Sequence, residues 1–527
     1  MEAVKSGKTS AYKLLTGLGK LKWNIAAKGI VAGAVAGLLA VAYRVLIEYG
    51  AQTTLRIYGM LRLHPVLVLP WLILITGVGF FIAWIIKLEP MASGSGIPQV
   101  KGVILYGMKM KWYTILFARF VGGALGAFSG LSLGREGPSI QIGAAGAQIV
   151  SGKTSNERLE ENYLITGGAA AGLSAAFNAP LSGMVFALEE IHRSFSPMIL
   201  IAATTASLTA DLISKYFLGL KPVLNFTTVA QWPISLYFWV IPLGLASGLS
   251  GVLMNKTLLG FQNLYGKFPE KTRPAIALLV ALPFGLLLPE VLGGGQGLIR
   301  FAELSKSGLT FMLILLAAKI LFTSTSFGSG IPGGVFMPIL SVGALSGSII
   351  GIIAARFGMP AQFISGFAIC AMAGALSGAV KAPVTSILLA AEMTGSLVHL
   401  MPVAACSFIA LLFSDVLKTS PLYEELLERF ASRNGHIVAA GQKGGLFEIP
   451  IEYGSQAADR MIRDIVWPQG VLIVAVKRGE KEIIPNGSMK ILPGDYLVIL
   501  SADDSENHTY DELKKLCFLT RTSQRPC

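Results

Sequence analysis

Three short glycine-rich segments in this 527-residue chain combine residue types that could bind an anion. They are residues 94–98 (GSGIP), 134–138 (GREGP) and 328–338 (GSGIPGGVFMP). Each ends in proline followed by an apolar run, which is the arrangement expected where a helix begins. A helix N-terminus carries free N–H groups and a partial positive charge. Several such ends directed at one centre would form an anion site without needing a full positive charge.

The second segment also places two charged residues, Arg135 and Glu136, inside an otherwise apolar stretch. Glycines that only let helices pack closely would explain the small residues but not this pair. A carboxylate buried in an anion site competes with the anion for the same N–H groups, and protonation removes its charge. If the carboxylate and the anion replaced each other at this site, proton movement would be coupled to anion movement. A salt bridge from Glu136 to an arginine is the structural alternative, although adjacent helix residues such as Arg135 do not face each other.

The composition indicates that these segments lie in a polytopic, all-α membrane protein. Hydrophobic residues make up 53% of the chain and charged residues only 14%, against about 25% charged in soluble proteins. This balance excludes a soluble multidomain enzyme and a disordered chain. Some uncharged runs reach the roughly 20 residues of a membrane span, whereas others are shorter and interrupted by glycine and proline. Such broken, re-entrant helices occur where the backbone is buried in protein or lines a watery cavity.

An internal repeat supports a transporter built from two halves. A set of five residues recurs at a constant offset of 203: Ser174, Ala176, Ala179, Pro180 and Glu189 match Ser377, Ala379, Ala382, Pro383 and Glu392. Residues 134–138 face residues 334–338 at an offset of 200. Secondary transporters are often built from duplicated halves with the substrate between them. The sequence alone leaves open whether the halves are inverted.

The charge distribution separates the membrane part from the C-terminal tail. Residues 421–527 hold 13 basic and 15 acidic residues, so the net charge of +13 comes from the membrane part. Lysines before the first apolar stretch predict a cytoplasmic N-terminus; they are Lys5, Lys8, Lys13, Lys20, Lys22 and Lys28. Nucleic-acid binding is the alternative, which we disfavour, so we expect no such partner. The four cysteines lack disulfide or metal spacing, and we expect no metal or cofactor.

The expected domain order follows from these shifts in composition. We expect a cytoplasmic segment at 1–28, a membrane domain at 29–423 with halves at roughly 29–218 and 230–420, and a polar linker at 424–444. A small cytoplasmic α+β domain at 445–503 and a tail at 504–527 would follow. Turn signals at 486–487 (NG) and 493–495 (PGD) separate four stretches that predict strands, at 446–451, 471–476, 483–485 and 496–500. Residues 455–465 predict a short helix.

In their order and spacing, the three glycine-rich segments closely resemble those of the CLC family of chloride channels and chloride/proton antiporters. The resemblance covers roughly residues 25–430, and residues 178–183 (NAPLSG) and 381–384 (KAPV) fit the same pattern. It implies the CLC fold, with two inverted repeats and broken re-entrant helices. It also implies a homodimer in membrane lipid, each subunit with its own pathway for chloride and protons.

The resemblance further implies roles for residues around a central anion. The Ser95 hydroxyl would donate to this anion, and Tyr423 would lend a second hydroxyl at the inner end of the pathway. The N–H groups of Val335 and Phe336 would complete the chloride site. The framework glycines of the three motifs would be Gly94, Gly96, Gly134, Gly333 and Gly334.

Two glutamates carry the implied proton coupling. Glu136 resembles the gating glutamate, beside an outer anion position formed by the N–H groups from Arg135 to Gly137. Glu190 matches a position that is glutamate in most proton-coupled members and apolar in the channels. For Glu189 beside it, we favour a solvated helix end that pairs with His192 or Arg193. Gln99 departs from the family, since many members carry glutamate there.

The C-terminal part, residues 445–501, resembles the TrkA-C (RCK-C) domain of potassium-uptake proteins. Its markers are residues 470–476 (GVLIVAV), 484–485 (IP) and 493–495 (PGD). The resemblance implies a regulatory domain that dimerises, either with a small ligand such as a cyclic dinucleotide or without any ligand. Because eukaryotic CLC proteins usually carry CBS domains there, it implies a prokaryotic cell (inner) membrane with both termini in the cytoplasm.

Proton-coupled chloride exchange is therefore the function that we expect. A passive voltage- or pH-gated chloride channel is the alternative, and a fluoride/proton antiporter is disfavoured because the fluoride branch departs from the GSGIP pattern. An intramembrane serine hydrolase using Ser95 or Ser329 would need a general base within reach. The membrane-region histidines form no recognisable pair for that role: His64, His192 and His399. We expect no catalytic residue and no enzyme activity.

Overall fold

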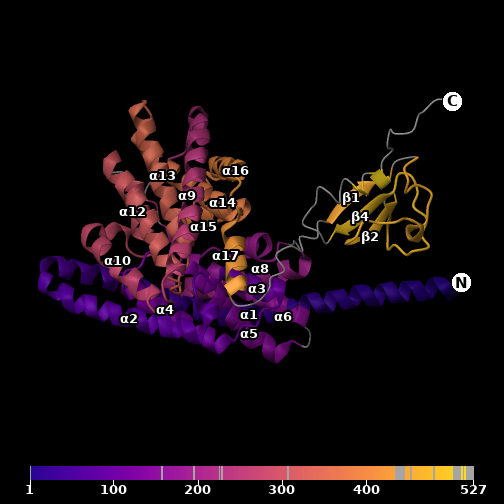
Figure 1. Cartoon of the computed structure of the whole chain (residues 1–527), viewed down its shortest axis with the longest axis horizontal. Helices are drawn as coiled ribbons and strands as arrows, with labels where there is room; N and C mark the ends of the chain where they lie inside the picture. The colour runs from indigo at the N-terminus through magenta and orange to yellow at the C-terminus, as the bar shows by residue number, and fades with distance from the viewer. Residues whose placement is uncertain are drawn as a thin grey trace. The chain divides into compact units, whose positions relative to one another are not determined.

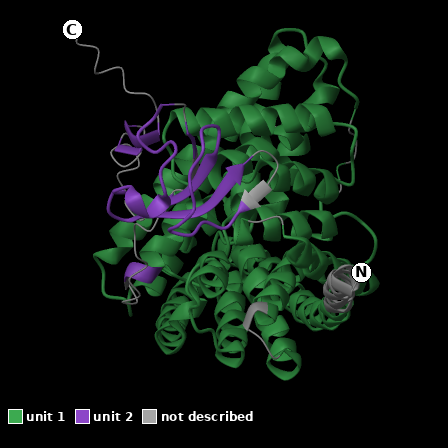
Figure 2. Ribbon diagram, turned by 90° about the vertical axis from the view of Figure 1, so that its right-hand side faces the viewer, with its two compact units in different colours: residues 1–430 green, residues 431–527 purple. Residues whose placement is uncertain are grey.

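The computed structural model describes residues 2–433, 446–501 and 512–517, apart from 156–157, 194–195, 225, 227–229, 305–307, 452–453, 479–480 and 514. Contacts divide the chain into two compact units, Met1–Phe430 and Ala431–Cys527 (unit 1 and unit 2 in Figure 2). The described part of unit 1 is helical, whereas unit 2 contains a four-stranded sheet.

Among the described residues of unit 1, the helices between residues 2 and 416 form two successive series of eight. The first series is α1 (Glu2–Leu63), α2 (Val68–Leu88), α3 (Ile97–Tyr106), α4 (Trp112–Phe128), α5 (Glu136–Thr154), α6 (Arg158–Phe177), α7 (Pro180–Phe186) and α8 (Pro197–Leu218). A π-helical turn, η3 (Ala187–His192), continues α7. The second series is α9 (Val240–Gly266), α10 (Arg273–Leu287), α11 (Gln296–Leu304), α12 (Leu309–Gly328), α13 (Phe336–Arg356), α14 (Ile364–Val380), α15 (Pro383–Thr394) and α16 (Leu400–Val416).

The two series match each other element by element, as the sequence repeat predicts. A short helix is followed by two longer ones at α3–α5 and again at α11–α13, and glycine-rich segments precede α5 and α13 at the same place. These two segments meet in an antiparallel bridge between Gly134 and Gly334. Figure 1 shows the first series in indigo and purple against the second in magenta and orange.

Several helices of unit 1 have the character of membrane spans. Among the described residues, seven helical segments are long and apolar enough to cross a membrane. The interior includes large parts of α5, α6, α13 and α14, and all of α14 is buried. Small residues allow this close packing: a Cβ atom at Gly347 would lie only 2.4 Å from the Phe367 carbonyl oxygen. The structure therefore has a buried helical core with apolar helices around it.

Helix α17 (Leu422–Arg433) extends the helical unit beyond the expected boundary at residue 423. Its apolar face is buried at Leu422, Tyr423 and Leu427. On its other side, Arg429 donates to the Leu259 carbonyl and to Asn263 of α9 at 3.1 and 2.7 Å. Residues 424–433 are therefore helical rather than linker. Their composition is polar overall, but their apolar residues lie on one face, as in an amphipathic helix.

Unit 2 contains an antiparallel sheet with strand order β1-β4-β2-β3. The strands are β1 (Leu446–Pro450), β2 (Val471–Arg478), β3 (Lys481–Ile483) and β4 (Tyr496–Ser501), close to the predicted stretches. Arg478 donates to both Asp495 oxygens at 2.8 Å. Burial opposes ionisation of Asp495, but the Arg478 guanidinium and the Leu492 N–H hold the pKa of this carboxyl below its usual value.

The helix predicted at residues 455–465 is wrong. This segment consists of turns and a 3-10 turn, η7 (Ile462–Asp464). Its internal backbone bonds are short turns, and other N–H groups bond to a neighbouring loop: Ile462 N–H donates to the Met489 carbonyl and Arg463 N–H to that of Gly487, both at 3.0 Å. Asp459 adopts a positive φ of 62°, which breaks a right-handed helix.

Candidate functional site

The three glycine-rich segments meet at one place in unit 1. Gly134 N–H donates to the Gly334 carbonyl at 2.7 Å, and Gly334 N–H donates back at 2.6 Å. The first segment joins the third through Gly94, whose N–H donates to the Gly330 carbonyl at 3.1 Å and whose carbonyl accepts from Gly333 at 3.1 Å. Gly94 and Gly330 have positive φ angles of 64° and 82°, which favour glycine at both positions.

Two helices, α5 and α13, start at this junction. Their first intrahelical bonds run from Ser139 N–H to the Arg135 carbonyl and from Ile339 N–H to the Val335 carbonyl, at 2.9 and 3.0 Å. The N–H groups that precede them have no partner within the helix, and Pro138 and Pro338 contribute none. The donors left are those of Glu136 and Gly137, and of Phe336 and Met337. These backbone groups alone could therefore hold an anion.

Ser95 and Tyr423 add two hydroxyl groups to this junction. A Cβ atom at Gly137 would lie 2.5 Å from the Ser95 carbonyl oxygen and from Ser95 Oγ, so Ser95 lies directly against the start of α5. The Tyr423 hydroxyl lies beside that of Ser95. Both are buried, and the described part of the chain offers neither hydroxyl a hydrogen bond of good geometry. Buried donors left without acceptors point to a ligand.

Aromatic rings enclose the same position. The Phe336 ring stacks on Tyr423 with ring centroids 6.4 Å apart and packs edge-on against Phe186 at 5.8 Å. Phe177 lies 6.1 Å from Phe336 on another side. The polar donors therefore face a low-dielectric surrounding, which strengthens any interaction with an anion.

Glu136 is buried at the start of α5, with its carboxylate folded back over the glycine segment. A Cβ atom at Gly134 would clash with Glu136 Oε2, so a side chain there would displace the carboxylate. The carboxylate faces the backbone N–H groups of Glu136 itself and of Met337. It therefore lies where the N-terminal donors of α5 and α13 would hold an anion.

Arg135, the neighbour of Glu136, is engaged elsewhere. Arg135 Nη1 lies 2.5 Å from Glu48 Oε1, and Arg44 Nε lies 3.4 Å from the same oxygen. The salt bridge considered from Arg135 to Glu136 is therefore replaced by a bridge to Glu48. Arg135 Nε and Nη2 are buried and unpartnered among the described residues.

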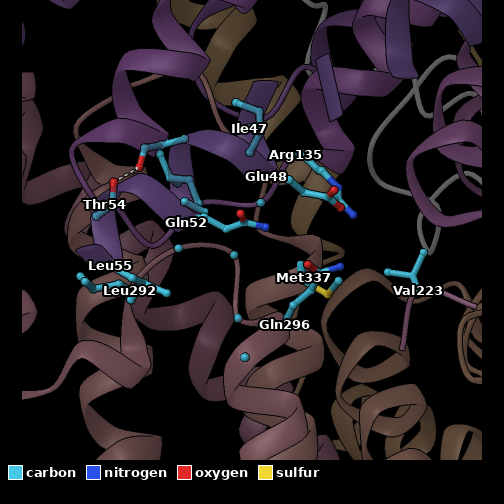
Figure 3. A pocket seen from close by; sticks show the side chains of 18 of the residues that line it. Ile47, Glu48, Gln52, Thr54, Leu55, Arg135, Val223, Leu292, Gln296 and Met337 are labelled. Carbon is cyan, nitrogen blue, oxygen red and sulfur yellow. Dashed lines mark hydrogen bonds and ion pairs between the residues drawn. The ribbon is translucent and has the colours of Figure 1, made fainter. Parts of the chain in front are cut away.

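A cavity of about 770 Å³ gives access to Glu136. Arg135 and Glu48 lie side by side in its wall, with Met337 and Gln296 across from them (Figure 3). Ser95, Tyr423 and Glu190 do not belong to its lining. Glu136 therefore separates this cavity from the two hydroxyl groups.

Arg119 and Lys319 are buried cations that sequence reasoning missed. Arg119 Nη1 donates to the Gly94 carbonyl and Arg119 Nε to Gln141 Oε1, both at 2.5 Å. Lys319 donates to the Val291 and Gly293 carbonyls at 3.0 and 2.8 Å. Each cation binds carbonyl groups of the loop that precedes a short helix, α3 for Arg119 and α11 for Lys319. The two residues lie 200 positions apart, the same offset that separates the second and third glycine segments. The sequence signal that could have identified them is a single cationic residue in each of two apolar runs, repeated at the offset of 200.

Gln99, the departure from the family pattern, has a structural partner. Its amide Nε2 donates to the Ser93 carbonyl at 2.7 Å, close to the first glycine segment. An ionised glutamate could not make this bond, because it has no donor. Gln99 therefore supports the backbone that carries Ser95.

Glu190 is buried in η3 and pairs with a lysine. Lys101 Nζ of α3 lies 2.9 Å from Glu190 Oε1, and both side chains are 2% exposed. Sequence reasoning missed Lys101, although a single lysine within the apolar helix after the GSGIP motif could have indicated it. Helix α3 thus links Ser95, just before its start, to Glu190.

Glu189, beside Glu190, does not pair with His192 or Arg193, so that expectation is wrong. Its carboxylate accepts from the N–H groups of Val384 and Thr385 at 3.1 and 2.7 Å, at the N-terminus of α15. An acidic group there satisfies free N–H donors and complements the helix dipole. Glu189 thus caps a helix of the other half.

Glu392 makes the equivalent contact in reverse. Its carboxylate accepts from Leu181 N–H at 3.0 Å and from Ser182 N–H at 2.8 Å, at the N-terminus of α7. Together, Glu189 and Glu392 form a reciprocal pair of caps between the halves. Their repeat offset of 203 indicates that they are equivalent positions.

The serine-hydrolase alternative has no support in this arrangement. Ser329 Oγ donates to the Ser326 carbonyl at 2.7 Å, and His399 contacts the Ala230 carbonyl at 3.0 Å. Within the described residues, no hydrogen bond joins Ser95 or Ser329 to a histidine.

Two protein families match the chain in separate segments. A family described as "Voltage gated chloride channel" matches residues 78–415, and the TrkA-C domain family matches residues 446–514. The "H(+)/Cl(-) exchange transporter ClcA" of Citrobacter koseri is 32% identical over 431 residues, covering 78% of this chain and 90% of that protein. The protein of the same name from Vibrio cholerae is 34% identical over 363 residues, covering 67% and 77%.

Solved structures are also similar to the chain. A slow cyanobacterial Cl-/H+ antiporter has a TM-score of 0.74 at 26% identity, covering 78% of this chain and 99% of the other. A CLC-type fluoride/proton antiporter has a TM-score of 0.61 at 23% identity, covering 77% and 97%, which shows the fold alone.

Proposed function

The chain belongs to the voltage gated chloride channel family, and we propose that it exchanges chloride for protons across a membrane. The observation that carries this proposal is the set of buried donors without acceptors at the glycine junction. The Ser95 and Tyr423 hydroxyls converge there with the N-termini of α5 and α13. A chloride ion would supply the missing acceptor without requiring any residue to change charge.

Glu136 supplies the link between the two ions. Its carboxylate occupies donors that a chloride would use, so the two cannot both be held there in charged form. When Glu136 takes up a proton, it loses the negative charge that binds the N–H groups, and chloride binds there instead. When it releases the proton, it returns. Each cycle therefore moves a proton and chloride in opposite senses past the same residue.

Glu190 distinguishes exchange from passive conduction. A channel needs no second proton-binding carboxylate, whereas an exchanger must pass protons to Glu136 from the other side of the membrane. Purified protein in liposomes, measured with a chloride electrode and a pH electrode together, tests this. An imposed chloride gradient should drive protons uphill. Chloride flux without proton movement would instead identify a chloride channel.

We expect Ser95→Ala to weaken the preference for chloride over nitrate. Ser95 Oγ is a buried donor with no described partner, and a lost hydrogen bond to a charged group is worth about 1.5–3 kcal/mol. The chloride-to-nitrate flux ratio should fall by roughly tenfold. Ser407→Ala, which also removes a buried and unpartnered hydroxyl, is the matched control. An unchanged ratio in an active Ser95→Ala protein would place the anion elsewhere.

The surroundings of the transporter are part of the same proposal. We infer a homodimer in the inner membrane of a prokaryotic cell, with both termini in the cytoplasm and lipid around the apolar helices. The lysines of the N-terminal segment and the TrkA-C domain support this orientation. We assign the TrkA-C domain a regulatory role, with a cyclic dinucleotide as the candidate ligand.

Truncation after Gly435 should leave coupled exchange intact. The residues proposed to bind chloride and protons all lie in unit 1, and α17 with Tyr423 is retained. Liposome flux should keep its proton-to-chloride ratio, while any response to cyclic dinucleotides should be lost. Loss of exchange in a folded, truncated dimer would show that the domain takes part in transport itself.

A further inference from the structure

Lys101 and Glu190 form an ion pair that is almost completely buried. The two charged atoms lie 2.9 Å apart, and each side chain is only 2% exposed. Lys101 belongs to α3, whereas Glu190 belongs to the π-helical turn η3 that continues α7. The pair therefore joins two elements of the first half near the anion junction.

Other charged groups also surround Glu190. Arg193, at the end of η3, pairs with Glu424 of α17, and both act on Glu190 electrostatically. Tyr423, the neighbour of Glu424, is influenced by Glu190 as well. Because Arg193 and Glu424 neutralise each other, Lys101 is the cation left to balance Glu190 among these groups.

A buried carboxylate without a cation does not remain ionised. Removing a charge from water costs far more than protonating it, so an isolated buried carboxyl keeps its proton. Such a neutral group cannot accept another proton. Glu190 can serve as a proton acceptor only while something holds it in the charged form.

We propose that Lys101 is a positioning residue that keeps Glu190 ionised and so ready to receive each proton from the cytoplasmic side. This inference rests on the proposed exchange function and names the residue that controls its inner proton step. The proton binds to a Glu190 oxygen and later leaves it toward Glu136. Lys101 keeps its own proton throughout, so the pair alternates between net charges of zero and plus one.

The position of Lys101 also gives the pair a route to the anion. Ser95 precedes α3, and Lys101 lies in the second turn of that helix. A change in the charge of the Lys101–Glu190 pair therefore occurs at α3, the helix that follows the proposed chloride donor Ser95. Protonation of Glu190 leaves an unbalanced lysine cation there, which favours an anion in the site at that moment.

The test compares Lys101→Met, Lys101→Arg and Lys101→Met combined with Glu190→Gln in liposomes. Lys101→Met should keep chloride flux but lose proton flux by at least about tenfold. Raising the internal pH should partly restore the proton flux, because it removes the proton that Glu190 retains. Lys101→Arg should rescue coupling, and the double variant should pump no less than Glu190→Gln alone. Lys215→Met, which breaks the Lys215–Asp211 pair on α8, is the matched control.

Infrared spectroscopy gives a second readout that does not depend on transport. Lys101→Met should show a protonated carboxylic acid band at neutral pH that is absent from the wild type and from the double variant. If wild-type protein moved no protons, the proposed exchange would fail while this band would still report on Lys101. Wild-type coupling in Lys101→Met without the new band would overturn the inference. Equal loss of both fluxes would also overturn it, since it would indicate a purely structural contact.

Discussion

Glu136→Gln is expected to carry chloride continuously while moving no protons against a chloride gradient. Glutamine has nearly the shape of a protonated glutamate but never becomes negative, so it cannot displace chloride from the donors of α5 and α13. The proton flux should fall to background, a loss of at least about a hundredfold for the removal of a positioned proton-transfer group.

The same variant should also lose most of the pH dependence of chloride flux. In the proposed mechanism, acid on the side of the cavity favours the protonated form of Glu136 and so favours chloride entry. In Glu136→Gln that titrating group is gone, and chloride flux should stay level across the range. Glu161→Gln, which removes a carboxylate in the first turn of α6, is the control. Robust proton pumping by Glu136→Gln would contradict the proposed mechanism.

Glu190→Gln is expected to lose proton movement while keeping a pH-sensitive chloride flux. The substitution removes the inner proton acceptor, and the lysine at 2.9 Å then faces a neutral amide. Proton flux should fall by at least about tenfold. Chloride flux should continue, because none of the donors at the glycine junction is altered.

The two glutamate variants differ in their response to acid on the cavity side. Glu190→Gln leaves Glu136 titratable, so chloride flux should still rise as that side is acidified. Chloride and pH electrodes read together at several pH values separate the two patterns. Glu425→Gln, whose carboxylate pairs with Arg429 at 3.2 Å on α17, is the matched control. A flat pH profile in Glu190→Gln would assign the gate to Glu190 instead of Glu136.

Much of this arrangement could be predicted from the sequence because it depends on local patterns. Glycine followed by proline marks helix starts, and a constant offset marks duplicated halves, so the junction of the three segments was predictable in outline. Ser95 lies against the start of α5, and Val335 directly precedes α13, which begins at Phe336. The strands of unit 2 were predictable from alternation and turn residues.

The remaining features depend on contacts between distant parts of the chain. Nothing near Glu189 in sequence indicates that its carboxylate caps α15, since Val384 and Thr385 follow almost 200 residues later. The partner of Arg135 could not be predicted from its sequence neighbours either, because that partner, Glu48, belongs to α1. Residues 455–465 have helical composition, yet several of their backbone N–H groups bond to other segments of unit 2. In each case a tertiary partner decided the outcome.

The reciprocal caps of Glu189 and Glu392 make the two halves mechanically dependent on each other. Each half supplies the carboxylate that the other needs to finish a helix, so neither half is complete when separated. Glu189 also adjoins Glu190, so the second half contacts the turn that carries the proposed proton acceptor. Each half thus completes a helix of the other half, and the contact that Glu189 makes lies next to the proposed proton acceptor.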